Sequence, residues 1–534
     1  MISRTAGRLA CSFLLLPLVA ACATFGGPEE ASTEQRADRW LVQVQALSSD
    51  AMEGRAAGTP GHQRAVDHVV AELRRIGLEP AGTEGFLQPV ALIEQRIDYS
   101  ASSARLTAGG STATVAMPDV AIPSAGRPLP ERLDAPLVFI GYGLHMPQSG
   151  HDDLAGVDLR GKIAVFVSGG PEEIAGSAKA HARAQRTRLL SEHGAVGSIA
   201  ISTPSQLESP WASSMRSSSQ PAMFLADAAL RSEAGPFLAM SWNPAEGERL
   251  FAGQSRSFAD IARASDASEP IAGFDMGARL NMTIASNRTE SISPNIVARL
   301  PGRSAALADE HIVLSAHLDG VGTGTATTGD NVNNGALDNA AGVAALIDIA
   351  ERLERGRPKR SILFVFVTAE ERGLLGSRYF ARRPSVPASS IVANLNYDMA
   401  LPIFPLTSIT VLGAEESAIG AMAEQVGAEM GLPLAPDPFP NRNSFIRSDQ
   451  YAFIEQGIPS AAFKFGFVAD TPEAELERQF RATRYHNLND DLTIRVYPQD
   501  EIRLHDFIAE LALRISNAEG RPQWNEGSIF ARSR

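Results

Sequence analysis

The chain has 534 residues, of which 44% are hydrophobic and 20% charged, and its formal net charge is −13 at pH 7. This is the composition of a globular protein with enough material for several domains. The acidic balance argues against a nucleic-acid partner, which would require a basic face. Cys11 and Cys22 are the only cysteines. The chain beyond residue 22 therefore has neither disulfides nor thiolate metal sites, and a metal there would need His, Asp and Glu ligands.

The N-terminus has the pattern of an export signal. "MISRTAGRLACSFLLLPLVAACATFGG" has two early arginines, an apolar run and then small residues, and it is too short for a membrane span. "VAAC", ending at Cys22, resembles the lipobox of bacterial lipoproteins, in which this Cys is lipidated, and Ala23 after it is typical of sorting to the outer membrane. We expect a signal peptide at 1–22, a polar tether at 23–35 and a protein facing the periplasm through this lipid anchor. A plain secretory signal, cut near Ala21 or Ala23, is the alternative.

Two helices are expected between residues 36 and 80, where apolar residues recur with helical spacing. Thr59 is placed to cap the second helix, Pro60 suits its first position and Gly77 ends it. Short strands with turns follow over 86–133.

A second pattern begins near residue 135, with strands such as "APLVFIGYGL" and a helix in "AHARAQRTRLLSEHGAV". From 294 onward, apolar strands alternate with helices. We expect strands at 310–320, 360–371, 390–400, 407–413 and 457–465, and helices at 338–356, 418–431 and 498–516. This alternation predicts an α/β fold with a mostly parallel, twisted sheet covered by helices on both faces.

Three of these strands end in side chains that can bind metals. "IVLSAHLD" ends in His317 and Asp319, "ILFVFVTAEE" in Glu370 and Glu371, and "VANLNYD" in Asp398. In an open parallel sheet the binding crevice lies outside the carboxyl ends of the strands, so these side chains should converge.

Asp338 begins the helix after the first of these strands and is expected over the same edge. Each acid alone has a simpler interpretation: Asp338 as a helix N-cap, Asp319 as a turn residue and Asp398 as a polar strand end. Together, five carboxylates and one histidine facing one crevice would repel strongly unless cations neutralise them. Divalent metals bound by His, Asp and Glu are the simplest explanation.

One further histidine, His486, lies in the polar loop "RYHNLNDDL" before the last helix. The motifs "SAHLDG", "GDNVNNGALDNAAGVAAL", "TAEERGLLGS", "NLNYDM", "RSDQYAF", "GIPSAAF" and "YHNLNDD" follow one another in the order of the co-catalytic zinc aminopeptidases. The chain resembles this family, which includes bacterial leucyl aminopeptidases, glutamate carboxypeptidase II and the transferrin receptor. The resemblance implies two Zn²⁺ per chain and peptide substrates with a free N-terminus.

The resemblance also implies a domain organisation. "LSSDAMEGRAAGTPGHQRAVDHVVAELRRIGLEP" is similar to the family's opening helices, and "FIGYGL" with "DDLAGVDLRGKIAVFVSGG" resembles a protease-associated domain, a smaller β-rich α/β unit. We therefore expect a peptidase domain in two segments, 36–130 and 285–520, around a protease-associated insert at 131–284. A tail is expected at 521–534.

Carried over residue by residue, the resemblance implies a ligand set. His317 and Asp398 would bind one zinc, Glu371 and His486 would bind the other, and Asp338 would bridge both.

The resemblance also implies catalytic roles. Glu370 matches the general base, and Asp319 matches the carboxylate that orients His317. Tyr485 precedes the ligand histidine, as in the carboxypeptidase relatives, where this tyrosine steadies the tetrahedral intermediate.

Other residues around the site bear on the substrate pocket and on the local backbone. "SDQ" at 448–450 stands where the family often has "SDH". Arg447 is expected to line the substrate pocket, with simple surface exposure as the alternative. A cis peptide bond between Asp338 and Asn339 is also implied.

Three other functions stay open. A carboxypeptidase or dipeptidase on the same scaffold would need an arginine cluster for the C-terminal carboxylate, and the sequence does not identify one. A non-catalytic binding lipoprotein, as in the transferrin-receptor branch, would have lost ligands or base, and none is lost here. A single-zinc, glutaminyl-cyclase-like enzyme would differ in metal stoichiometry.

Overall fold

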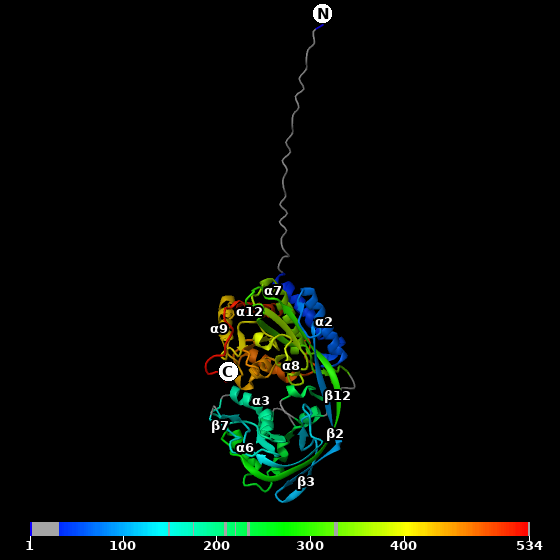
Figure 1. The fold of residues 1–534 in the computed structure, drawn as a ribbon, viewed down its shortest axis with the longest axis vertical. Helices are drawn as coiled ribbons and strands as arrows, with labels where there is room; N and C mark the ends of the chain where they lie inside the picture. The colour runs from blue at the N-terminus through cyan, green and yellow to red at the C-terminus, as the bar shows by residue number, and fades with distance from the viewer. Residues whose placement is uncertain are drawn as a thin grey trace.

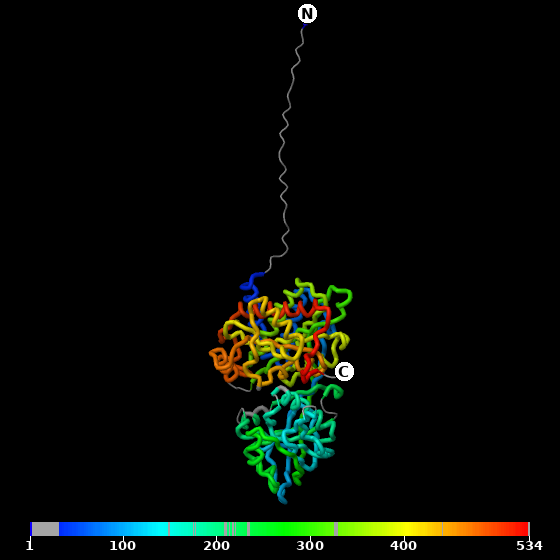
Figure 2. Tube along the Cα trace, turned by 90° about the vertical axis from the view of Figure 1, so that its left-hand side faces the viewer, coloured from blue at the N-terminus to red at the C-terminus, as the bar shows by residue number. Residues whose placement is uncertain are grey.

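The computed structural model describes residues 1–2, 31–147, 150–174, 176–207, 211–218, 220–231, 235–324 and 329–531. The expected lipidation site, Cys22, and nearly all of the expected signal peptide lie outside these ranges. Two bodies are visible: an upper one formed by the first and last parts of the sequence, and a lower one formed by the middle part (Figures 1 and 2). None of the helices in the described ranges combines the length and apolar character of a membrane span.

A buried sheet in the upper body carries the site. Its strands are β13 (His311–His317), β16 (Ser361–Val367), β17 (Ile391–Asn396), β20 (Ser460–Phe465), β18 (Ile409–Leu412) and β19 (Leu434–Ala435). β13 pairs in parallel with β16 and β17, and β20 pairs in parallel with β17, whereas β18 runs antiparallel to β20. Runs such as "SILFVFV" form fully buried strands because their side chains are mostly apolar, and many are β-branched or aromatic, so both faces of the sheet can be buried. The predicted α/β fold class is confirmed.

Helices cover both faces of this sheet (Figure 1). One face is covered by α1 (Thr33–Leu47), α2 (Pro60–Ile76), α7 (Ala341–Gly356), α9 (Ala418–Met430) and α12 (Pro498–Asn517). On the other face lie α8 (Leu375–Arg382) and α10 (Gln450–Ile454), whose Phe380 and Phe453 rings pack 6.0 Å apart. α11 (Pro472–Thr483) precedes the loop of His486.

The predicted ends of α2 are confirmed. Thr59 accepts a hydrogen bond from the His62 N–H through its side chain, and Pro60 is the first helical residue. Gly77 ends the helix with a φ of 92°, a left-handed conformation that favours glycine.

α1 begins at Thr33, inside the segment 23–35 that we expected to be a tether. The reason is a reciprocal cap: the Gln35 N–H donates to Ser32 Oγ (3.2 Å) and the Ser32 N–H donates to Gln35 Oε1 (2.9 Å). The polar character of this stretch therefore belongs partly to a helix N-terminus.

Buried polar contacts join α1 to α7 and α12. Arg36 pairs with Asp348 of α7 at 2.7 Å, and His505 of α12 contacts the same carboxylate at 2.9 Å. Burial disfavours the charged imidazole, but the contacts with Asp348 and Glu501 outweigh it and raise the pKa of His505 to about 9. The N-terminal segment is thus an integral part of the upper body.

Two long strands connect the upper body to the lower one. β2 (Leu87–Ala108) and β12 (Phe274–Leu300) pair antiparallel along both bodies (Figure 1). The lower body is built from β3 (Ser111–Val115), β4 (Ala121–Pro123), β5 (Arg132–Phe139), β8 (Ile163–Val167), β9 (Gly197–Ile201), β11 (Leu238–Trp242), α3 (Gly176–Glu192), α4 (Trp211–Ser218), α5 (Gly247–Leu250) and α6 (Phe258–Asp266). β1 (Glu79–Pro80) pairs with β12 and β10 (Ala222–Leu225) with β2, whereas β6 (His145–Met146) with β7 (His151–Asp152) and β14 (Gly322–Thr323) with β15 (Val332–Asn333) form two separate two-stranded sheets.

The apolar core of the lower body extends from Ile97 to Ile284. The predicted insert, 131–284, falls within this range. At its beginning, however, residues 97–129 pack with this core, ahead of the predicted start at 131. The difference arises because β2 crosses between the bodies as one strand, so no linker marks the passage in the sequence.

The described part of the expected tail, 521–531, packs against the upper body. The Trp524 indole N–H donates to the carbonyl of Gly457 at 3.0 Å, and Phe530 is buried. This segment therefore contributes to the fold.

Candidate metal centre

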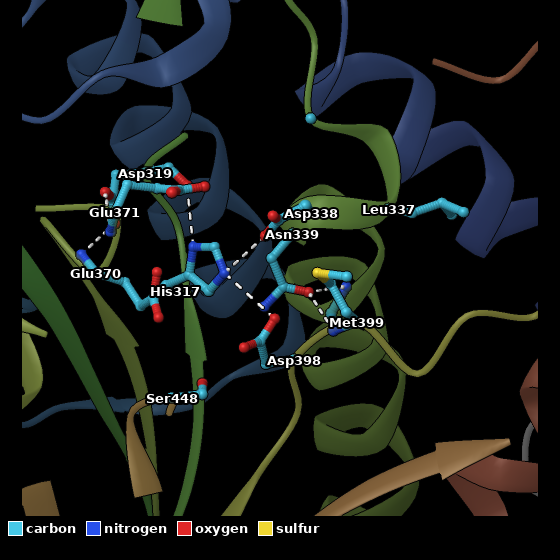
Figure 3. Close-up of polar contacts among 12 residues, drawn as sticks. His317, Asp319, Leu337, Asp338, Asn339, Glu370, Glu371, Asp398, Met399 and Ser448 are labelled. Atoms are coloured by element: carbon cyan, nitrogen blue, oxygen red, sulfur yellow. Dashed lines mark hydrogen bonds and ion pairs between the residues drawn. The ribbon is translucent and has the colours of Figure 1, made fainter. Parts of the chain in front are cut away.

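The predicted ligands converge at the carboxyl edge of the sheet. His317 is the last residue of β13, Glu370 and Glu371 follow β16, and Asp398 follows β17 (Figure 3). Because these strands are parallel neighbours, their ends meet at one edge. Asp338 reaches the same place from the turn that precedes α7.

Two ligand sets share Asp338. In the first, His317 Nε2 lies 3.1 Å from Asp338 Oδ1 and 3.4 Å from Asp398 Oδ1. In the second, His486 Nε2 lies 3.2 Å from Asp338 Oδ2 and 3.0 Å from Glu371 Oε2. Within each set the ligand atoms all lie within 4.8 Å of one another. One carboxylate thus turns one oxygen to each set.

The donor atoms fit divalent metals. His317 Nε2, Asp398 Oδ1 and Glu371 Oε1 are buried and make no hydrogen bond of good geometry, although His317 Nε2 lies within ion-pair distance of Asp338 and Asp398. Buried polar atoms without partners are costly, and a cation would satisfy all three. Carboxylate and imidazole donors in sets of three are those of zinc sites.

The electrostatics show how strongly this cluster attracts positive charge. Burial alone would lower the pKa of His317, but Glu370 and the contacts with Asp338 and Asp398 raise it well above its ordinary value. Burial also opposes the charged form of His486, but its contacts with Asp338 and Glu371 raise the pKa of His486 to about 10. The carboxylates therefore hold protons on both imidazoles in the absence of metal, and a metal would take the place of those protons.

The loop that carries Asp338 is held from two sides. The Asp490 carboxylate accepts hydrogen bonds from the Leu337 and Asp338 N–H groups, at 3.1 and 3.0 Å. The Asn339 side chain donates to the carbonyl of Tyr397 at 2.9 Å, beside Asp398. The peptide bond between Asp338 and Asn339 is cis, which confirms that prediction.

Asp319 acts differently from the role that the resemblance implies. His317 Nδ1 contacts the backbone carbonyl of Asp319 at 3.1 Å, so the tautomer is set by the backbone and not by the carboxylate. The Asp319 carboxylate instead accepts the N–H groups of Glu370 and Glu371, at 3.0 and 3.3 Å. The chain turns after His317, and this turn carries the side chain over to the neighbouring strand end (Figure 3).

Two acids, Glu370 and Asp449, interact electrostatically with His317 and Asp398. Burial raises the pKa of Glu370 well above its ordinary value, and Asp449 adds to the shift by repulsion. Burial also raises the pKa of Asp449 to about 7. Gln450, the departure from the family's "SDH", is fully buried. Its side chain accepts a hydrogen bond from the Asn396 side chain at 2.8 Å and so supports the end of β17.

Tyr485 and Arg447 lie at the periphery. The Tyr485 ring stacks on His486, with centroids 3.8 Å apart, so it supports the ligand that is more exposed. Arg447 is exposed and does not contact the ligand sets. It lines a separate cavity, together with Arg183 of α3 and Arg442, where the two bodies meet.

Two buried residues that the sequence analysis missed organise the site. Asp490 lies in the motif "YHNLNDD" but was not singled out. Arg55, 1% exposed, donates to the carbonyls of Leu47 (2.5 Å), Leu318 (3.1 Å), Asn334 (2.7 Å) and Gly335 (2.9 Å). The only sequence signal for Arg55 was a charged residue within the family-like opening stretch "DAMEGRAAGTPG".

Comparison with known proteins agrees with this geometry. Residues 295–511 match the model of peptidase family M28, which confirms the resemblance to zinc aminopeptidases that the motifs predict. Over 207 residues the chain is 28% identical to probable leucine aminopeptidase 2 of Aspergillus fumigatus, covering 37% of this chain and 38% of that one. Over 103 residues it is 34% identical to the vacuolar membrane protease of Eremothecium gossypii, covering 19% and 9%. The chain thus spans less than two fifths of these relatives.

The fold as a whole is shared with a solved structure. The aminopeptidase from Aneurinibacillus sp. strain AM-1 superposes with a TM-score of 0.51 at 18% identity, covering 94% of this chain and 98% of that one. The likeness therefore includes both the upper body and the inserted lower body.

Proposed function

We propose that the protein is a two-zinc aminopeptidase that removes N-terminal residues from peptides. The observation that carries this proposal is the placement of Asp338, whose two oxygens lie 3.1 Å from His317 Nε2 and 3.2 Å from His486 Nε2. A carboxylate between two sets of His and acidic ligands is suited to bridge two metals. The match to peptidase family M28 and the leucine aminopeptidase relatives support the same activity.

The chain's own residues supply the remaining chemistry. When bound, a pair of divalent metals supplies an activated water and polarises the scissile carbonyl. Glu370, next to the ligand Glu371, accepts a proton from the attacking water and passes it to the leaving amine. The Asp319 carboxylate fixes the backbone position of both glutamates by accepting hydrogen bonds from their N–H groups. Tyr485, whose ring stacks on His486, is assigned to steady the developing oxyanion by the family resemblance.

A substrate panel tests this function. We expect purified protein loaded with zinc to hydrolyse aminoacyl-p-nitroanilides and to leave their N-acetylated counterparts intact, because recognition requires the free amine. EDTA should abolish the activity and added zinc should restore it. Absence of turnover on every free-amine substrate by zinc-loaded protein would refute the proposal.

A carboxypeptidase or dipeptidase is the second candidate. The cavity between the two bodies is lined by Arg183, Arg442 and Arg447, a cluster that could hold a C-terminal carboxylate. N-acetylated peptides separate the two functions: a carboxypeptidase would release their last residue, whereas an aminopeptidase would not act on them.

We also propose that the protein is exported and anchored to the outer membrane through lipid on Cys22. The basic, apolar and small-residue pattern of 1–22 and the "VAAC" motif support this. Metabolic labelling with radioactive palmitate should mark the wild-type protein and not the Cys22→Ser variant. Unlabelled wild-type protein would favour the plain secretory signal.

A further inference from the structure

Lys464 links a cavity to the metal centre, because it lines the cavity and donates to the backbone carbonyl of the ligand Asp398. The cavity begins at Ala400 and Leu401, extends over β20 and β18, and has a volume of about 40 Å³. Most of its wall is apolar, from Phe404, Leu412, Phe439, Phe465 and Phe467.

The cavity also contains a buried ammonium group. Lys464 of β20 donates to the backbone carbonyls of Asp398 and Met399, at 2.7 and 2.8 Å. An ammonium has three N–H donors, so one is left for another acceptor. Among the residues that the structure describes, no carboxylate forms an ion pair with Lys464, and burial lowers its pKa.

Two guanidinium groups add to this positive charge. Arg442 pairs with Glu477 at 2.7 Å, and Arg481 pairs with the same carboxylate oxygen. One carboxylate thus serves two arginines, and Lys464 adds a further charge. Asp437 is the other acid in the wall. The wall itself therefore has three cations and two acids, and outside the wall the Asp398 carboxylate of the metal centre also attracts Lys464.

We propose that this cavity receives the side chain of the substrate's N-terminal residue and that its cations select an acidic side chain, glutamate or aspartate. The proposal rests on the aminopeptidase function above. An enzyme that removes single residues holds the amine at the metals, so the first side chain lies near the ligands, and Lys464 joins this cavity to the backbone of the ligand Asp398. A carboxylate accepts the third N–H of Lys464 in an environment shielded from water, where charge-assisted hydrogen bonds are strong.

Other side chains fit this cavity less well. Leucine would fill the apolar part but would leave the Lys464 N–H without an acceptor, which is unfavourable for a buried donor. Lysine or arginine would bring a like charge beside Lys464, Arg442 and Arg481. The expected order of preference is therefore glutamate, then leucine, then lysine.

The specificity ratio tests the proposal. We expect the wild-type enzyme to hydrolyse glutamyl-p-nitroanilide with a higher kcat/KM than the leucyl substrate. In Lys464→Met the glutamyl-to-leucyl ratio should fall roughly 10–100-fold, since a charged hydrogen bond to the substrate is lost. Lys359→Met, which removes an exposed lysine at the opposite edge of the sheet, is the matched control and should keep the wild-type ratio.

The ratio is insensitive to partial loss of metal or of folded enzyme, because both substrates see the same active fraction. A wild-type preference for leucyl over glutamyl substrate, or an unchanged ratio in Lys464→Met, would overturn the inference while leaving the aminopeptidase function intact. If Lys464→Met is inactive, the test rests on the wild-type enzyme alone: a higher kcat/KM for the glutamyl than for the leucyl substrate supports the inference, and the reverse overturns it. Failure of zinc-loaded wild-type protein to cleave any aminoacyl substrate would instead refute the function itself.

Discussion

Replacing Glu370 with glutamine is expected to leave both metals bound and to lower turnover by roughly 10²–10⁴-fold, the range for loss of a general base. The amide keeps the shape of the carboxylate but cannot accept the proton from the attacking water. The backbone N–H of residue 370 still donates to Asp319, so the strand end should keep its position.

Glu371→Gln is the matched comparison, because it makes the same chemical change one residue away. Glu371 faces His486 at 3.0 Å in the second ligand set. Its loss should lower the occupancy of one metal and leave activity partly recoverable with added zinc. Metal content and turnover are measured side by side on both variants. Equal metal loss in the two, or near-normal turnover of Glu370→Gln, would contradict this division of roles.

Arg55→Met is expected to damage the metal centre although Arg55 is no ligand. The guanidinium holds the backbone just after His317 and just before Asp338, through the carbonyls of Leu318, Asn334 and Gly335. The charge of Arg55 is also buried among the acids of the site. Its removal should cost about 3–5 kcal/mol of unfolding free energy, as for other buried charges with several partners.

A positioning role adds a second effect to this loss of stability. We expect zinc affinity to fall roughly 10–100-fold, as when groups that orient metal ligands are removed. Chelator competition measures affinity on the folded fraction, and Arg96→Met, at an exposed arginine on β2, is the control. A variant that is less stable but binds zinc with wild-type affinity would show that Arg55 supports the fold alone.

The sequence predicts the site well where the signal is local. Apolar runs that end abruptly in His317, Glu371 or Asp398 place those side chains at one sheet edge, because parallel strands end together. Within the chain the structure brings all five predicted ligands into two sets that share Asp338.

What the sequence could not predict depends on contacts between distant segments. Arg55 donates to the carbonyls of residues 318 and 334, and no pattern near Arg55 in the sequence predicts those partners. The Asp319 carboxylate turns to the neighbouring strand end because of a backbone turn that composition does not specify. The start of the lower body at Ile97 is hidden for a similar reason, since β2 continues through it without a break.

Anomalous scattering at the zinc edge, from crystals of the zinc-loaded protein, tests the central claim most directly. Two peaks are expected. One should be bordered by His317, Asp338 and Asp398, and the other by Asp338, Glu371 and His486. A single peak at full occupancy, or two peaks without Asp338 between them, would contradict a two-metal centre bridged by Asp338.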